Sequence, residues 1–224
     1  MGHRQVNIEY ILKLLTQSYG NRIWQKRLEP VDELILTILS QNTSDTNSHR
    51  AFKSLREEFG SLEKVAAAET RQIADAIRGG GLADAKAKYI KNALMELKKK
   101  TGDFNLQFLL EMDVRSAREW LIRLPGVGMK TASCVLLFSL GMPAFPVDTH
   151  VFRVTRRLGI IDPKISVDAA HPKLEGLIPP RDIYRSHMLF IEQGRKVCKA
   201  QRPLCPICIL KDICPSFNTF RRSL

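Results

Sequence analysis

The chain has 224 residues, 44% of them hydrophobic, which is enough for a sizeable core in one compact body or in two interlocked small lobes. Lysine and arginine number 35 against 23 aspartate and glutamate, so the net charge of +12 predicts a polyanionic partner. A membrane span is excluded because the longest apolar run is interrupted by Gly141, Pro143 and Pro146. Since the N-terminus lacks the apolar core of a signal peptide, we expect the protein in the cytoplasm.

Apolar residues follow a helical spacing almost throughout the chain, and no convincing strand pattern occurs, so we predict an all-α fold. A capping box at Ser116–Glu119 is expected to start the helix that leads into Leu124–Gly128, and a second helix follows that segment. The remaining patterns place helices at residues 7–19, 31–40, about 45–59, 70–77, 83–99, 150–158, 166–174 and 182–194.

Two short breaks in the helical pattern are candidates for contacts with the anionic partner. The first is the polar segment Gln41–Asp45, in which Ser44 or Asp45 is expected to cap the next helix. The second is Gly79–Gly81, followed by Leu82 and by two lysines just inside the next helix. A plain linker is the alternative, but exposed glycine backbone favours a turn that grips a sugar-phosphate chain.

The segment Leu124–Gly128 is the strongest candidate for the active site. The glycines Gly126 and Gly128 permit turn conformations and a close approach of backbone N–H groups to an anion, as in a phosphate-binding hairpin. Lys130 opens the following helix, where the positive helix end disfavours an ammonium and makes the amine a better nucleophile. Asp148 follows a short apolar run. Its carboxylate is expected to share a pocket with that amine, and also to cap the helix that follows.

Four of the five cysteines form a dense set near the C-terminus with the pattern C-x6-C-x2-C-x5-C. Such spacing in a cytoplasmic chain indicates a metal site, and thiolates hold either zinc or a four-iron cluster. The fifth, Cys134, is expected in the core. The proposed ligands are Cys198, Cys205, Cys208 and Cys214.

The predicted helix at residues 150–158 carries Arg153, Arg156 and Arg157. These arginines could be plain surface charges.

The cysteine spacing, the hairpin LPGVG-x-KTA and the element VDTH together resemble the endonuclease III family of DNA glycosylases, in the helix-hairpin-helix superfamily. The likeness runs from about Leu34 to Pro215. It implies a [4Fe-4S] cluster on the four cysteines and a two-lobed helix-hairpin-helix fold with a C-terminal iron-sulfur cluster loop. A six-helix barrel would span residues 30–140, and residues 1–29 with 141–224 would form the cluster domain, with DNA in the groove between them.

The resemblance also implies roles for individual residues. Lys130 would attack C1′ of a flipped-out damaged nucleotide, and Asp148 would stabilise the positive charge left when the base departs. Gln41 or Asn42, together with Leu82, would fill the gap left in the duplex. The hairpin glycines Gly126 and Gly128 and the cluster-loop residues Lys199 and Arg202 would contact DNA phosphates.

We therefore expect a monomeric, nucleoid-associated base-excision-repair glycosylase with AP lyase activity, acting on duplex DNA with a damaged base or an abasic site. Two departures from the family bear on the lesion, for which oxidised pyrimidines are the first expectation. Met129 stands where a basic residue is common, and Phe190–Arg195 lacks a histidine found before the first cysteine. A monofunctional mismatch glycosylase and a non-catalytic DNA-binding metal module are the alternatives.

Overall fold

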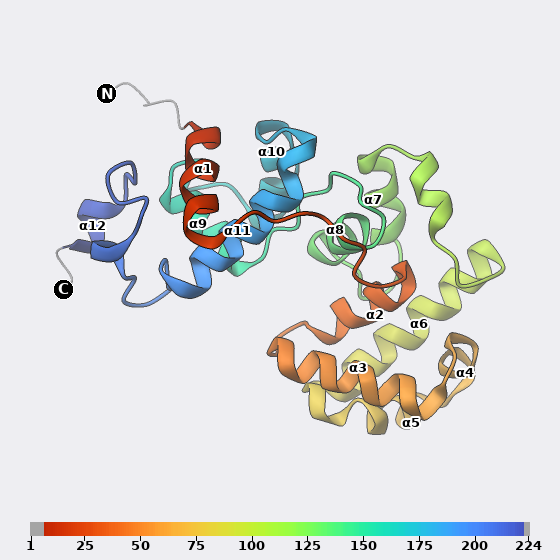
Figure 1. Ribbon diagram of the computed structural model, residues 1–224. Coiled ribbons are helices and arrows are strands. Elements are labelled where there is room, and N and C mark those ends of the chain that lie inside the picture. Colours follow the sequence, from red (N-terminus) through yellow and green to blue (C-terminus); the bar gives the residue numbers. More distant parts are fainter. Residues whose placement is uncertain (1–6, 222–224) are drawn as a thin grey trace. The chain divides into compact units, whose positions relative to one another are not determined.

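The structure is a computed structural model that describes residues 7–221, and within this range its regular elements are all helices, which confirms the all-α prediction (Figure 1). None of the described helices is long and apolar enough to cross a membrane. The chain divides into two compact units. One unit is Gln25–Met142, called here the hairpin unit. The other combines the described residues before Gln25 with those from Pro143 onward, and is called the cysteine unit.

The hairpin unit contains seven of the described α-helices and two short 3-10 turns. They are α2 (Pro30–Leu39), α3 (Asp45–Phe59), α4 (Leu62–Ala67), α5 (Thr70–Ala76), η1 (Arg78–Gly80), α6 (Ala83–Thr101), η2 (Gln107–Glu111), α7 (Val114–Ile122) and α8 (Met129–Phe138).

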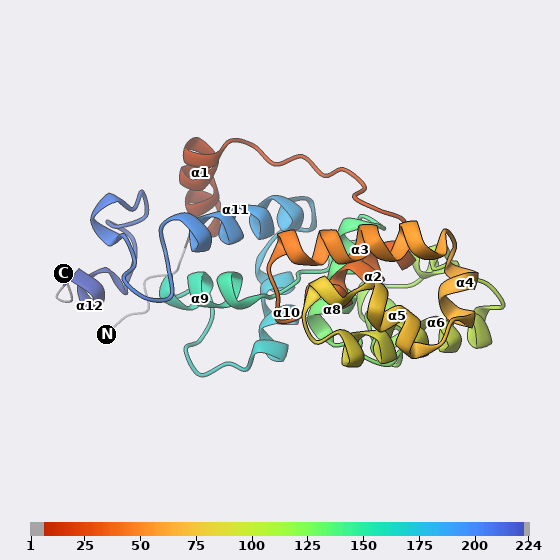
Figure 2. The ribbon, with the colours of Figure 1, turned by 90° about the horizontal axis from the view of Figure 1, so that it is seen from below.

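Helix α2 is the centre of the hairpin unit and packs against α3, α6 and α8 (Figure 2). Pro30 occupies its first turn, where the missing N–H costs nothing, and every residue of α2 except Asp32 is buried. Its buried carboxylate, Glu33, pairs with Arg27 and accepts a hydrogen bond from the hydroxyl of Thr37 at 3.1 Å. An almost wholly buried helix fixes both of its ends, including the polar segment that follows Leu39.

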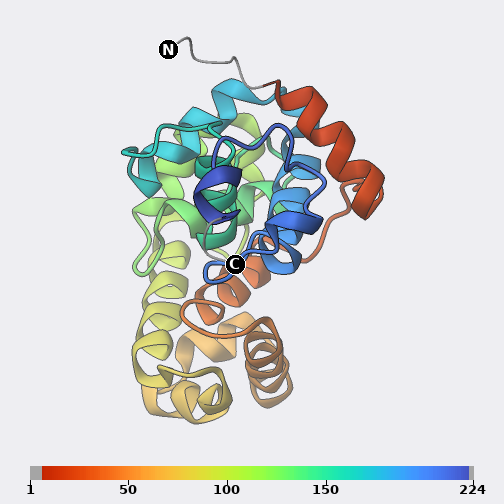
Figure 3. The same cartoon turned by 90° about the vertical axis from the view of Figure 1, so that its left-hand side faces the viewer.

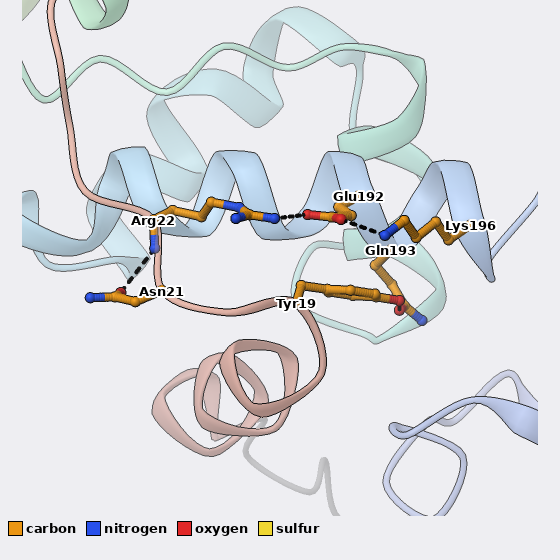
Figure 4. A network of polar contacts seen from close by, with 6 residues as sticks. All are labelled: Tyr19, Asn21, Arg22, Glu192, Gln193 and Lys196. Atoms are coloured by element: carbon orange, nitrogen blue, oxygen red, sulfur yellow. Dashed lines mark hydrogen bonds and ion pairs between the residues drawn. The ribbon is translucent and has the colours of Figure 1, made fainter.

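The cysteine unit packs α11 between α1 and α9. Side chains from the end of α1 and from the segment after it reach α11: Arg22 pairs with Glu192, and the Tyr19 hydroxyl donates to Gln193 Oε1 at 2.6 Å (Figure 4). Burial raises the pKa of Tyr19 to about 12, so this hydroxyl remains a donor. The described helices of this unit are α1 (Ile8–Tyr19), α9 (Thr149–Arg157), α10 (Val167–Leu177), η3 (Pro180–Asp182), α11 (Ile183–Lys196), η4 (Cys205–Ile207) and α12 (Phe217–Arg221).

The structure corrects some local predictions and confirms others. The expected capping box at Ser116 is wrong, because Asp113 caps α7 and accepts a hydrogen bond from the Ser116 N–H at 3.0 Å. Helix α4 was not predicted, since only six residues separate its capping serine from the next turn and so short a pattern carries little periodicity. Ser44, one of two predicted caps, is the N-cap of α3. Cys134 is buried, as predicted.

Candidate active site and cysteine cavity

The hairpin between α7 and α8 depends on one glycine more than on the other. Gly126 has a φ of +77°, and a Cβ placed on it would lie only 2.6 Å from the Cβ of Tyr89. Gly128 has an extended backbone, with φ −101° and ψ −178°, and open space where a Cβ would point. Of the two glycines expected to permit special turn conformations, only Gly126 adopts one. Gly128 instead leaves room beside the first N–H groups of α8, which lack intrahelical acceptors.

Lys130 is the second residue of α8 and is half-buried. Its neighbour Thr131 is buried, so the start of the helix is anchored while the lysine side chain is only partly covered. Within the described hairpin unit, no side chain or carbonyl forms a hydrogen bond or an ion pair with the Lys130 amine. Within this unit, therefore, no internal partner would have to be displaced before the amine reacts.

Gln41 and Asn42, the two candidates for filling a gap in DNA, differ in their surroundings. The Gln41 side chain turns back to the hairpin, where its Nε2 donates to the Gly126 carbonyl at 3.2 Å and lies 3.4 Å from the Thr131 hydroxyl. Asn42 is exposed and has a φ of 52°, in the left-handed region. Gln41 thus braces the hairpin, whereas Asn42 is exposed to solvent.

The glycine turn lies beside the polar segment that carries Asn42. A Cβ on Gly81 would be 4.0 Å from the Thr43 hydroxyl oxygen. Leu82, just after the turn, is 61% exposed and has a φ of 51°, so a large apolar side chain is held out in a strained backbone conformation. Among the described non-glycine residues, only Asn42, Leu82 and Arg202 have positive φ. Such strain persists where the surroundings impose it, which is common at functional sites.

In the cysteine unit, Asp148 is the N-cap of α9, and its Oδ1 accepts a hydrogen bond from the Val151 N–H at 2.7 Å. The predicted capping role is confirmed by this bond. The carboxylate is half-buried, so one oxygen is fixed by the helix while the group as a whole remains partly accessible. A cap of this kind gives the carboxylate a defined orientation.

The extended segment before Asp148 is held by three side chains from α10 and α11. Glu175 accepts from the Phe145 N–H at 2.6 Å, and the Nδ1 of His171 donates to the Phe145 carbonyl at 2.8 Å. The Nδ1 of His187 donates to the Pro146 carbonyl at 2.9 Å. Both histidines are buried, and carbonyl acceptors require the proton on Nδ1. Sequence reasoning missed this support, because single histidines in amphipathic helices carry no pattern.

The four predicted ligand cysteines line one cavity, beside Gln193, Arg157, Leu210, Phe217 and Phe220 (Figure 3 faces this end of the unit). All four are free thiols of intermediate exposure. In residues 7–221 no three Cys, His, Asp or Glu side chains converge tightly enough to hold a single metal ion. Sequence spacing alone therefore identified a set of thiols that the fold gathers around a common space.

N–H donors are directed at two of these sulfurs. Gln193 Nε2 lies 3.2 Å from Cys208 Sγ, and Arg157 Nη1 lies 3.4 Å from Cys198 Sγ. Burial raises the pKa of the Cys214 thiol to about 11 and also raises those of Cys205 and Cys208. Buried thiols stay protonated unless a cation compensates their charge, whereas donors stabilise thiolates. The donor set therefore fits a positively charged metal group bound by thiolates.

The loop with Lys199 and Arg202 is attached to α9 by arginines, so the interpretation of these arginines as plain surface charges is wrong for Arg153 and Arg157. Arg153 Nε donates to the Cys198 carbonyl at 2.8 Å. Arg157 donates to the carbonyls of Lys199, at 2.7 Å, and of Ala200, at 3.1 Å. Lys199 and Arg202 are both exposed, so the loop presents two cations on a fixed backbone.

The predicted site residues thus fall into two groups. The hairpin unit contains Gln41, Asn42, Leu82, Gly126, Gly128 and Lys130. The cysteine unit contains Asp148, Lys199, Arg202 and the four cysteines.

Comparison with known proteins gives consistent matches. The family profile described as HhH-GPD superfamily base excision DNA repair protein matches residues 35–180. Endonuclease III of Thermotoga maritima is 35% identical to this chain, and the match covers 86% of each protein. Endonuclease III of Sulfolobus acidocaldarius is also 35% identical, and the match covers 81% of this chain and 79% of the Sulfolobus protein. A solved structure of endonuclease III trapped as a covalent intermediate with DNA superimposes with a TM-score of 0.84 at 31% identity, covering 99% of this chain and 100% of the other.

Proposed function

Since the chain belongs to the HhH-GPD superfamily of base excision DNA repair proteins and is a DNA-binding DNA glycosylase of this kind, we propose that it also cleaves the strand as an AP lyase, with Lys130 as the nucleophile. The observation that carries this proposal is the position of Lys130. Lys130 is half-buried, its amine has no hydrogen-bond or ion-pair partner in the described hairpin unit, and it directly follows the glycine hairpin, whose backbone N–H groups suit an anion. A glycosylase that uses only water as its nucleophile has no need of an amine there.

The proposed reaction has two parts. The amine of Lys130 forms a bond to C1′ while the bond from C1′ to the base breaks, and the base leaves with the electron pair and takes up a proton. Opening of the sugar then gives a Schiff base between Lys130 and C1′. Loss of a C2′ proton from this imine expels the 3′ phosphate by β-elimination. Water finally hydrolyses the imine and restores the amine, so no redox step is needed.

Asp148 is proposed to stabilise the positive charge that develops on the sugar as the base departs. Its fixed Oδ1 and partial exposure support this role, because a carboxylate that caps a helix N-terminus keeps a defined orientation. The grip of His171, His187 and Glu175 on the preceding backbone supports it further, since it prevents the carboxylate from shifting during the reaction.

Asn42 and Leu82 are proposed to fill the gap left by the flipped nucleotide. Asn42 is favoured over Gln41 because the Gln41 amide is engaged with the hairpin, whereas Asn42 is exposed. Flipping costs a few kcal/mol of stacking and pairing, which inserted side chains offset. Gln41 would act indirectly, by bracing the hairpin that carries Lys130.

The four cysteines are proposed to bind a [4Fe-4S] cluster, which would supply structural cross-linking of the loop. A set of thiols around one cavity, with N–H donors toward two sulfurs, is suitable chemistry for such a group, and likeness to endonuclease III favours iron over zinc. Gly126, Gly128, Lys199 and Arg202 are proposed to contact DNA phosphates. Oxidised pyrimidines in nucleoid DNA are the proposed lesions, and a monomer is the proposed working form.

Borohydride trapping on duplex DNA with one abasic site tests the proposal. Reduction of the imine leaves a covalent protein–DNA adduct, which is expected for the wild-type chain. Strand cleavage and adduct should appear together. A protein that removes bases without a trapped adduct would be a monofunctional glycosylase, and one that binds DNA without either product would be a non-catalytic module.

A further inference from the structure

We propose that Lys86 is a positioning residue that couples the two gap-filling segments, so that Asn42 and Leu82 enter DNA as one unit. This inference rests on the proposed function of those two residues. It does not concern the chemistry at Lys130. Its basis is the place of Lys86 in the hairpin unit, which differs from what its sequence context predicts.

Lys86 is one of the two lysines just inside α6 that the sequence interprets as a contact to a sugar-phosphate chain. The structure corrects this for Lys86, because the residue is only 2% exposed. Its Nζ donates to the Leu39 carbonyl at 2.7 Å and to the Gly80 carbonyl at 2.9 Å. An amine in this position binds no phosphate, and it holds together two segments that are distant in sequence.

The two acceptors lie at the base of the two gap-filling segments. Leu39 is the last residue of α2, three residues before Asn42. Gly80 is the last residue of η1, two residues before Leu82. One ammonium therefore fixes the starting point of both segments. The segments are also close beyond this point, since a Cβ on Gly81 would lie 4.0 Å from the Thr43 hydroxyl oxygen.

The cost of this arrangement indicates that it has a specific role. Burial lowers the pKa of Lys86, because removal from water disfavours its charge. No carboxylate in the described residues pairs with it, so two carbonyl oxygens alone compensate the ammonium. An apolar side chain would fill the same space without this cost. An apolar side chain, however, cannot accept the role of the ammonium, which binds the carbonyls of Leu39 and Gly80 at once and so fixes the distance between them.

Backbone strain gives a second, independent reason for such a brace. Asn42 and Leu82 both have left-handed backbones, with φ of 52° and 51°. Non-glycine residues leave this conformation unless neighbouring structure imposes it. Arg50 also supports the turn, by donating to the Gly79 carbonyl at 3.4 Å, but it is exposed. Lys86, in contrast, is buried, and its amine binds the backbone next to both strained segments.

Replacement of Lys86 by methionine tests the proposal, with Lys91→Met as the matched control. Lys91 lies on the same helix and its Nζ also donates to a carbonyl, that of Ala68 at 2.7 Å, but this contact is not with either gap-filling segment. One measurement is the rate of abasic-site cleavage in a duplex relative to the same site in a single strand, which leaves no gap to fill. We expect this ratio to fall about tenfold in Lys86→Met and to be unchanged in Lys91→Met.

The second measurement needs binding only. A 2-aminopurine placed opposite a tetrahydrofuran abasic analogue fluoresces when inserted side chains disturb its stacking. At saturating protein, Lys86→Met should give about half of the wild-type rise, and Lys91→Met the full rise. If the methionine variant does not fold, Lys86→Gln, which keeps an amide donor, replaces it in both assays.

Equal ratios and equal fluorescence for the Lys86 and Lys91 variants would overturn the role of Lys86. A wild-type protein that binds the duplex but cleaves neither DNA would instead overturn the proposed lyase function, and the fluorescence assay would still decide on Lys86. A loss of both duplex and single-strand cleavage in equal proportion would mean that Lys86 only stabilises the fold, which also contradicts the proposal.

Discussion

The hairpin unit and the cysteine unit hold their functional residues by different means. In the hairpin unit, every residue of helix α2 except Asp32 is buried. Packed helix ends and glycine turns position the site residues of this unit. In the cysteine unit, the segment Leu204–Ile213 exposes most of its apolar side chains, with Ile207 at 74%, and buries Leu210. The first region is therefore held by its own core, whereas the second depends on arginine hydrogen bonds and on the metal group proposed for the cysteines.

This difference separates two kinds of site. A lysine nucleophile must be placed accurately but must also be free to move onto its substrate, which suits a rigid hairpin on a packed core. A DNA-contacting loop with two cations needs only a fixed backbone, which a metal group supplies without a large core. Substitutions in the two units should therefore differ in their effects on activity, DNA binding and stability.

The largest effect is expected for Lys130→Gln, which removes the proposed nucleophile while keeping a polar side chain of similar length. Cleavage at abasic sites and borohydride trapping should fall by at least about 10³-fold, because no imine can form. DNA affinity should change by less than about threefold, since the hairpin backbone is untouched. Lys99→Gln, an exposed lysine of the same unit to which no DNA contact is assigned, is the control. Undiminished trapping in Lys130→Gln would assign the nucleophile elsewhere.

Asp148→Asn should reduce base excision by roughly 10²–10³-fold, because an amide cannot stabilise the cationic sugar as a carboxylate does. Asparagine is also a good N-cap, so the melting temperature should barely change. The matched control is Asp113→Asn, which alters another aspartate cap, that of α7. Single-turnover excision and thermal melting separate the two roles of Asp148. If both aspartate variants excise normally, Asp148 serves only as a cap.

The sequence alone predicted the hairpin, Lys130, the capping role of Asp148 and the set of four cysteines, because each is a local pattern whose chemistry follows from residue type and spacing. It did not predict the residues that hold these groups in place. The sequence gives no sign that Lys86 is buried or that Tyr89 packs against Gly126, because both depend on which residues of α6 face neighbouring elements. Nor does it separate Gln41 from Asn42, since only the fold determines which amide turns toward the hairpin.

Cys208→Ser tests whether the cysteine unit depends on the proposed metal group. We expect loss of iron and sulfide, a lower melting temperature and a DNA affinity reduced about tenfold, because Lys199 and Arg202 lose their fixed backbone. Metal analysis, visible absorbance and binding at one stated salt concentration measure these effects. Cys134→Ala, in the core of the hairpin unit, should keep full iron content. One zinc per chain in the wild type would overturn the iron assignment.

The smallest effect, and the sharpest test of the hairpin geometry, is expected from a pair of glycine substitutions two residues apart. Gly126→Ala places a Cβ 2.6 Å from that of Tyr89 and forces alanine to a φ of +77°, so it should destabilise the protein by about 1–3 kcal/mol. Gly128→Ala meets open space at an ordinary φ of −101° and should leave the unfolding free energy nearly unchanged.

The same pair separates stability from binding. A methyl group on Gly128 points into the space proposed for a phosphate, so this variant should weaken DNA binding while it melts like the wild type. In the double variant Gly126→Ala with Tyr89→Ala, removal of the ring relieves the steric clash but not the backbone strain. Chemical denaturation should therefore show only partial recovery relative to Tyr89→Ala alone. Full recovery would mean that close packing against Tyr89, and not the left-handed turn, is the reason for a glycine at position 126.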